Sequence, residues 1–232
     1  DKILRLFPSG TLETVIHLLG KESRIPFALH LDHGMTFEIC AHCIQQGYQS
    51  VMMDGGALPL KENITSTQRV VEYAHPYGVA VEGQVGEVGA SWDKGKKSKL
   101  TDPLEAQEFV QRTKVDLLAI SIGTESGFYE DKPSLDLDLA EEILRRTGIH
   151  LVLHGSSGLS KEAVGECRRA GITHLRFGTD LHQSFFDAIR RKREEVGNKG
   201  IQPHLLLPVT KEAIKEVVRK KIEQLGSIGK AY

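Results

Sequence analysis

Short apolar runs alternate along the chain with longer stretches in which apolar residues recur at helical spacing. Six runs end in polar residues, usually with a glycine, and are expected to be strands: 25–31, 50–54, 79–85, 117–122, 151–154 and 174–178. Stretches with helical spacing lie between or after them, at 37–46, 64–75, 103–112, 137–147 and 161–170. Strands that alternate with helices of this length predict parallel strands joined by right-handed crossovers.

Polar residues near the strand ends distinguish between two architectures. Alternate positions along the strands place these residues on one face: His30, Asp32, Asp54, Glu82, Gln84, His154, His174 and Arg176. An open doubly wound sheet would concentrate such groups at one crevice, whereas the strand ends of a barrel converge on a single face. Because every strand contributes, the sequence favours a (β/α)8 TIM barrel. No linker interrupts the pattern, so a single domain is expected over residues 1–232.

Composition and charge narrow the class of protein. The 232 residues are 40% hydrophobic and 26% charged, with a net charge of −1, which favours neither nucleic acid nor an anionic membrane as the main partner. No apolar run approaches the roughly 20 residues of a membrane-spanning helix. Three cysteines, Cys40, Cys43 and Cys167, are too few for a disulfide scaffold, so a reducing, cytoplasmic setting is expected. The lone C-x-x-C pair is interpreted as buried packing.

Several segments together carry a resemblance to a known family. "ALHLDHG", "SVMMDGGALPLKENI", "VVEYAHPYGVAVEGQVG", "IGTESGFYEDKPSLD", "LVLHGSSGL" and "KEVVRKKIEQLGSIGKA" follow one another in this order. From about Ile25 to Ala231 the chain resembles the class II, zinc-dependent fructose-bisphosphate and tagatose-bisphosphate aldolases. This resemblance implies a (β/α)8 barrel, with a match that starts at the third strand of the family. The barrel is therefore expected to lack its first two strands in this sequence.

Missing strands would leave two barrel edges with unpaired backbone groups, which invite pairing with another chain. We expect a further N-terminal segment, a rearrangement or a neighbouring chain to cover them. The expected partners are accordingly a phosphorylated sugar substrate and other copies of the chain in a homo-oligomer.

The resemblance implies roles for the histidine and aspartate motifs. Asp32 corresponds to the residue that handles a proton on the substrate hydroxyl, and His33 and His154 correspond to zinc ligands. Cleavage of a carbon–carbon bond beside a carbonyl leaves an enediolate, whose charge a Lewis acid spreads while a carboxylate moves the proton. A class I aldolase would need a strand-end lysine for a Schiff base, and the six strand ends have none.

Three positions depart from the family pattern. Ser126 occupies the place of the third zinc histidine, Gln84 replaces the second of two glutamates, and Arg176 replaces an asparagine that contacts the substrate. Glu82, the first glutamate, is kept. Two histidines alone would hold zinc weakly, so water or a carboxylate such as Glu82 or Glu125 is expected to complete the set. The guanidinium of Arg176 requires a carboxylate or phosphate partner.

Two loops are expected to bind a substrate phosphate. Glycine lets backbone N–H groups approach an anion, and barrels often use the loops after their last two strands in this way. The residues at these places are Gly155, Ser156, Ser157, Gly178, Thr179 and Asp180. The cluster Lys94, Lys96, Lys97 and Lys99 is interpreted as a solvated loop, with attraction of an anionic substrate as the alternative.

The sequence thus predicts an aldolase-like lyase that acts on a phosphorylated ketose with a zinc ion, and with Asp32, Glu82 and Arg176 as its catalytic set. Two alternatives stay open: a catalytically impaired pseudoenzyme or partner-binding subunit that keeps the phosphate pocket, and a related lyase that depends less on metal. His30 is interpreted as a polar residue that fills the barrel. Asp54 is interpreted either as a site residue or as a cap of the next loop.

Overall fold

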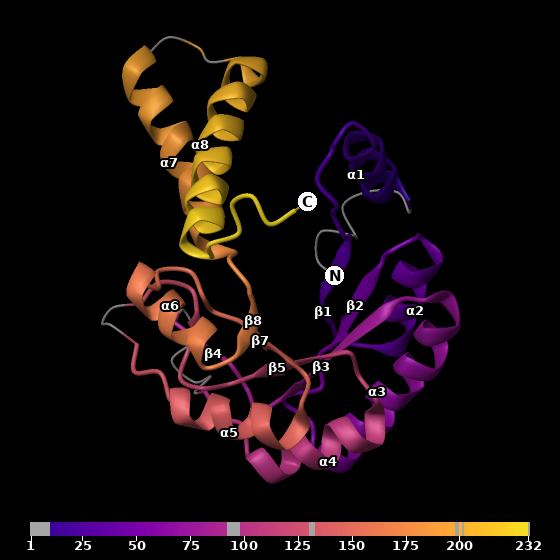
Figure 1. Ribbon diagram of the computed structural model, residues 1–232. Helices are drawn as coiled ribbons and strands as arrows, with labels where there is room; N and C mark the ends of the chain where they lie inside the picture. Colours follow the sequence, from indigo (N-terminus) through magenta and orange to yellow (C-terminus); the bar gives the residue numbers. More distant parts are fainter. Residues whose placement is uncertain (1–9, 92–97, 130–132, 198–199, 201, 232) are drawn as a thin grey trace.

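A six-stranded parallel sheet forms the centre of the molecule. The computed structural model describes residues 10–91, 98–129, 133–197, 200 and 202–231. The strands lie in the order β1-β2-β3-β5-β7-β8. Their bounds are β1 His30–Gly34, β2 Ser50–Met53, β3 Ala80–Val85, β5 Leu117–Ile120, β7 His150–Leu153 and β8 Ile172–Leu175. The sheet curls into an open ring with β1 and β8 as its two edges, so the predicted partial (β/α) barrel is confirmed (Figure 1).

Five helices cover the convex outer face of this sheet (Figure 1). They are α2 Phe37–Gln45, α3 Leu60–Ala74, α4 Pro103–Thr113, α5 Leu137–Thr147 and α6 Lys161–Arg169, and the short 3-10 turn η2 His75–Tyr77 follows α3. The side chains of Thr36, Asp102, Asp136 and Ser160 each accept a hydrogen bond from the first turn of the helix that follows. Fully buried side chains such as Phe109, Ile64, Leu118 and Leu151 form the core between helices and sheet.

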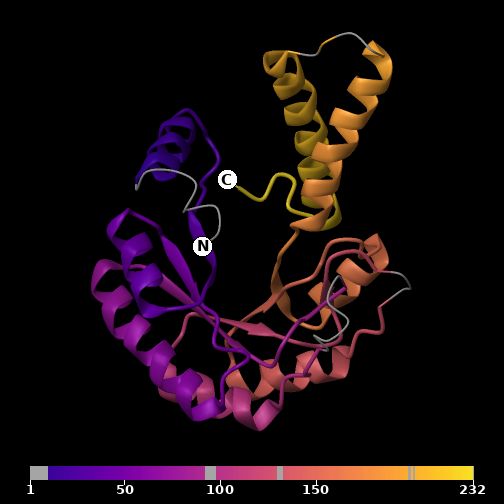
Figure 2. The same ribbon diagram turned by 180° about the vertical axis from the view of Figure 1, so that it is seen from behind.

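The other helices lie at the two ends of the open ring. Helix α1, Thr11–Lys21, lies near the start of β1, and α7, Thr179–Val196, packs against α8, Pro203–Gln224, as a hairpin that projects beyond β8 (Figures 1 and 2). A separate pair of short parallel strands, β4 Gly89–Ala90 and β6 Glu125–Ser126, lies after β3 and β5 along the chain. No helix of the described residues is long and apolar enough to cross a membrane.

Strand β1 starts later than the apolar pattern predicts. The prediction began at Ile25, whereas the strand covers His30–Gly34. Its partner β2 starts at Ser50, which is in register with His30, so the residues before Leu29 have no neighbouring strand with which to form a ladder. Tertiary pairing, rather than apolar content, therefore sets the start of this strand.

All three cysteines pack in the core, and this confirms the prediction made for the pair Cys40 and Cys43. Cys40, Cys43 and Cys167 are free and buried. Burial is the largest influence on their thiols and raises the pKa of Cys40 to about 12, which makes it unreactive.

Candidate active site

An irregularity in β1 brings two neighbouring polar residues to the same place. The register of β1 against β2 shifts between Leu31 and Gly34, which leaves room for one extra residue. His33 adopts φ 57°, a left-handed conformation that is uncommon for residues other than glycine. In a regular strand Asp32 and His33 would point to opposite faces, whereas the bulge lets both join one cluster. Strained backbone of this kind is frequent at functional sites.

The glycine that ends this motif is required by packing. A Cβ atom on Gly34 would lie 2.6 Å from the carbonyl oxygen of Met52 and 2.8 Å from Sγ of Cys40. Any side chain would push β1 away from β2 and from helix α2. The glycine after His33 therefore keeps the bulged strand close to its neighbours.

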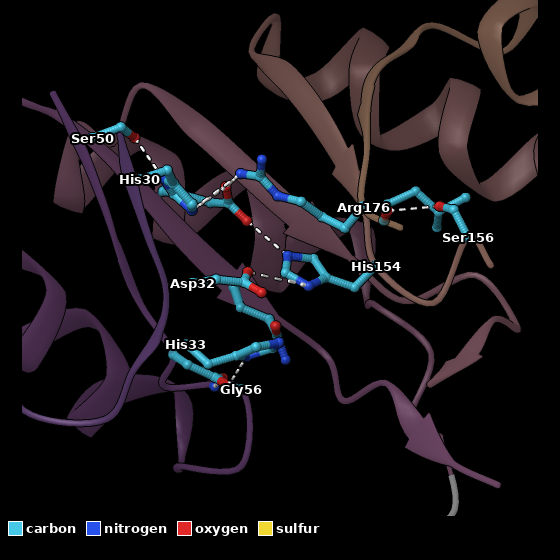
Figure 3. Close-up of polar contacts among 12 residues, drawn as sticks. His30, Asp32, His33, Ser50, Gly56, His154, Ser156 and Arg176 are labelled. Carbon is cyan, nitrogen blue, oxygen red and sulfur yellow. Dashed lines mark hydrogen bonds and ion pairs between the residues drawn. The ribbon is translucent and has the colours of Figure 1, made fainter. Parts of the chain in front are cut away.

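Asp32, His33 and His154 form a group that could hold a metal ion. One ligand atom from each lies within 4.8 Å of the others. Nδ1 of His154 is 4.0 Å from Oδ1 of Asp32, and the rings of the two histidines meet edge to face with centroids 4.8 Å apart. Asp32 and His33 come from β1, and His154 follows β7 directly, so the curl of the sheet joins them (Figure 3).

A carboxylate holds each histidine through one ring nitrogen. Nδ1 of His33 is 2.7 Å from Oδ2 of Asp54, and Nε2 of His154 is 2.8 Å from Oε1 of Glu82. These contacts leave Nε2 of His33 and Nδ1 of His154 for a metal. Metal-binding histidines in proteins commonly pair their second nitrogen with a carboxylate in this manner, so the donor set fits an imidazole-bound divalent metal.

The His33–Asp54 contact has the electrostatics of an ion pair. Burial is the largest influence on His33 and lowers its pKa, but the hydrogen bond to Asp54 and the charges of Asp54, Asp32 and Glu82 outweigh it and raise the pKa above its ordinary value. Burial likewise raises the pKa of Asp54, but the hydrogen bond and charge of His33 bring it below its ordinary value. Each partner thus favours the charged form of the other.

Glu82 is the centre of a buried network on the inner face of the sheet. Its side chain is 0% exposed. One carboxylate oxygen contacts His154, and the other accepts a hydrogen bond from Nη2 of Arg176. Burial is the largest influence and raises the pKa of Glu82, but the hydrogen bond from His154 and the charge of Arg176 bring it down to about 2. Glu82 is therefore an anion with both oxygens engaged.

His30 belongs to the same network. Nη2 of Arg176 is 3.1 Å from Nε2 of His30, and Nδ1 of His30 is 2.9 Å from Oγ of Ser50. Because a guanidinium can only donate, Nε2 must accept, and the proton sits on Nδ1, which donates to Ser50. Burial, then the charge of Arg176, lowers the pKa of His30 to about 4. His30 was predicted to fill the barrel; the structure shows a neutral imidazole that fixes Arg176. Its shared strand parity with Asp32 was the available signal.

Arg176 has the carboxylate partner that the sequence required. It follows β8, and its backbone joins the loop after β7, since its N–H donates to the carbonyl of Leu153 (3.0 Å) and its carbonyl accepts from the N–H of Ser156 (3.1 Å). Its Nε is buried and has no hydrogen-bond partner among the described residues, as is also true of Oε1 of Gln84.

The loops after β7 and β8 are tied together. The backbone N–H of Asp180 donates to Oγ of Ser157 (3.2 Å), and its carboxylate accepts from the N–H of Gly158 (3.3 Å). The same carboxylate pairs with Nζ of Lys221 on α8 at 2.6 Å. Asp180 thus anchors the first loop to the start of α7 and to the helical hairpin.

Glycines shape both loops. Gly155 has φ 69°, and a Cβ atom there would lie 2.5 Å from the carbonyl oxygen of Glu125, so this loop passes directly against β6. Tyr129 reinforces the contact, because its hydroxyl donates to the carbonyl of Gly155 and accepts from the N–H of Glu125. Gly178 precedes α7, where Thr179 is the first helical residue and no side chain caps the helix.

Two other predicted features lie on β6 and on the loop before α4. Ser126 lies on β6, where its carbonyl accepts a hydrogen bond from Ser91 (2.8 Å). Lys99 lies 3.8 Å from Glu105 in an exposed ion pair. The remaining lysines of that loop, Lys94, Lys96 and Lys97, lie outside the described residues.

Comparisons with known proteins show the family to which this fold belongs. A family model described as fructose-bisphosphate aldolase class-II matches residues 6–230. The chain is 36% identical over 228 residues to a 6-phospho-5-dehydro-2-deoxy-D-gluconate aldolase of Shouchella clausii, which covers 96% of this chain and 78% of that relative. It is 38% identical over 229 residues to a fructose-bisphosphate aldolase of Geobacillus stearothermophilus, which covers 96% and 79%. The crystal structure of the YdjI aldolase from Escherichia coli K12 superposes with a TM-score of 0.84 at 30% identity, over 96% of this chain and 78% of that one.

Proposed function

Since the chain belongs to the class II fructose-bisphosphate aldolase family, we propose that it is a lyase that cleaves or forms a carbon–carbon bond in a phosphorylated ketose. The observation that carries the proposal is the pair of carboxylate-held histidines, His33 and His154, beside two glycine-bearing loops at the carboxyl ends of the strands. This face is where barrel enzymes place their chemistry.

We propose zinc as the metal, held by His33 and His154. When bound, it would act as a Lewis acid toward the carbonyl of the ketose. Ser126 stands where the family has a third histidine, so the affinity for zinc should be lower than that of a three-histidine site.

The described residues suggest different roles for the three proposed catalytic side chains. Asp32 has a side chain that is 56% exposed, so its carboxylate is accessible to take and return the hydroxyl proton of the substrate. Glu82 is fully buried, which supports a positioning role: it orients His154 and neutralises Arg176. Arg176 would then fix Glu82 and carry the loop of Ser156 through its backbone.

The substrate phosphate would bind between the loops after β7 and β8. The backbone N–H groups of Gly155 and Ser157, and those of Gly178 and Thr179 before α7, are proposed to contact it. Ser156, whose N–H donates to the carbonyl of Arg176, would instead hold the shape of the first loop. The carboxylate of Asp180 already binds Gly158 and Lys221, which supports a role in shaping the loop.

We also propose a cytoplasmic homo-oligomer. Three buried free thiols support a reducing location. The open edges β1 and β8 support association, as do exposed apolar side chains such as Leu18 and Leu19 on α1 and Leu207 on α8.

Aldol cleavage in the presence and absence of metal tests the function. We expect zinc-supplemented protein to cleave a phosphorylated ketose such as fructose 1,6-bisphosphate. The cleavage is measured through coupled enzymatic reduction of the carbonyl product. A chelator that removes the metal should abolish the cleavage. His154→Ala should lower kcat/KM by at least about 100-fold. Mutation of a residue that only hydrogen-bonds to a metal ligand already costs about 10–100-fold in metal affinity or activity. His204→Ala, an exposed change on α8, should leave turnover unchanged.

Calorimetry with the same sugars separates the alternative. Binding of a sugar phosphate without cleavage at saturating zinc would favour the alternative, a pseudoenzyme. Ser126 at the place of the third histidine is the reason to test this alternative. Absence of both binding and cleavage across phosphorylated ketoses would contradict the proposed substrate class.

A further inference from the structure

We propose that Asp32 is the third protein ligand of the metal when no substrate is bound, which makes this a two-histidine, one-carboxylate site. The inference rests on the metal-binding part of the proposed function. It concerns the substrate-free protein, so it leaves Asp32 available for proton transfer once substrate occupies the site.

The positions of the donor atoms support this assignment. Oδ1 of Asp32 is 4.0 Å from Nδ1 of His154, and a ligand atom of His33 completes a group within 4.8 Å. Two ligands of one tetrahedral ion, with bonds of about 2.1 Å, lie roughly 3.4 Å apart. Small rotations of the exposed Asp32 side chain would bring its oxygen to that separation.

The competing carboxylates are already engaged. Glu82 uses one oxygen for His154 and the other for Arg176. Asp54 uses Oδ2 for His33 and Oδ1 for the N–H of Gly56 at 3.3 Å. Glu82 and Asp54 therefore orient the ligands. Among the described residues of the cluster, Asp32 is the carboxylate that makes no hydrogen bond and lies beside both histidines.

The bulge in β1 supplies the reason for this geometry. The left-handed backbone at His33 places Asp32 and His33, two consecutive residues, in the same group. A carboxylate then stands near the metal in a chain that has Ser126 in place of the third histidine. Replacing a neutral imidazole by an anionic oxygen makes the donor set harder, which should widen acceptance toward Mn²⁺, Fe²⁺ and Co²⁺.

Metal titration of the full chain, without substrate, tests the proposal. Co²⁺ binding is followed by its visible absorption, and Zn²⁺ affinity is obtained by competition. We expect Asp32→Ala to weaken the affinity for the metal by more than about 100-fold, since loss of a residue that only hydrogen-bonds to a metal ligand costs about 10–100-fold. Asp32→His should bind Zn²⁺ at least as tightly as the wild type, with a changed Co²⁺ spectrum. Asp138→Ala, which removes an exposed carboxylate on α5, is the matched control and should bind as the wild type does.

Several results would overturn the assignment. Unchanged affinity and an unchanged Co²⁺ spectrum in Asp32→Ala would show that Asp32 is not a ligand, as would failure of the folded wild type to bind either metal. Circular dichroism verifies folding, and Asp32→Asn, which keeps the shape of the side chain, should also lose affinity. Because no substrate is present, the outcome is independent of turnover: a protein that cleaves no ketose could still show every expected binding result.

Discussion

Replacement of Glu82 by alanine is expected to destabilise the protein by about 3–5 kcal/mol at pH 7, the usual cost of removing one partner from a buried ion pair. The side chain is 0% exposed and binds both His154 and Arg176. Its removal leaves the guanidinium, which is 29% exposed, without its carboxylate, and leaves Nε2 of His154 without an acceptor. Urea denaturation monitored by circular dichroism gives the free energy of unfolding directly.

A double-mutant cycle shows whether the loss arises from the ion pair. Glu82→Ala combined with Arg176→Ala should cost less than the sum of the single changes, with a coupling free energy of about 0.5–3 kcal/mol. Glu82→Gln keeps the volume and one acceptor, so its cost should be smaller than that of alanine. Additive effects of the two alanine changes would mean that Glu82 and Arg176 stabilise the fold independently.

Periodicity in the sequence was sufficient for the order of the strands and for the covering helices, although β1 and β8 are displaced from the predicted runs at 25–31 and 174–178. Parallel strands that alternate with helices have few arrangements, so the runs at 50–54 and 79–85 appear as β2 and β3 with small differences at their ends. The helical hairpin of α7 and α8 was not among the predicted helices. These two helices pack against each other as a hairpin rather than against the sheet, so the βα pattern does not extend to them.

The sequence indicated which residues belong to the candidate site, but not which of them contact one another. Strand-end position and the family resemblance pointed to His33 and His154. The bulge that joins Asp32 to His33 breaks the alternation on which the face assignment was based. Alternation also gave no sign that Asp54 would hold His33, since that contact joins the residue after β2 to the bulged end of β1.

Arg176 shows how segments far apart in the sequence together accommodate a guanidinium. A partly buried guanidinium needs acceptors, and the two that it finds come from β1 and β3, far from it in the sequence. An anionic Glu82 and a neutral His30 are together what make this position suitable for arginine. The role of His30 therefore depends on the charges of Arg176 and Glu82, which lie in other segments of the sequence.

The free energy of unfolding is expected to fall as the pH is lowered from about 6.5 to about 4, with His30 as a main cause. Burial and Arg176 lower the pKa of His30 from 6.5 to about 4 in the folded protein. Over this range the unfolded chain binds a proton at His30 that the folded protein does not, so lower pH favours unfolding, by at most about 3 kcal/mol. Glu82, whose pKa is lowered from 4.5 to about 2, adds a further loss as the pH falls below about 4.5.

Comparison of variants isolates the contribution of His30. His30→Gln keeps an acceptor for Arg176 and a donor for Ser50 but does not titrate, so the difference in unfolding free energy between wild type and variant should shrink or reverse as the pH falls from 6.5 to 4. His204→Gln, exposed on α8, should follow the wild type. Burial and Arg176 also lower the pKa of His174, which contributes in the same direction and cancels in the comparison. A difference between wild type and His30→Gln that is constant with pH would show that His30 is not the neutral acceptor that fixes Arg176.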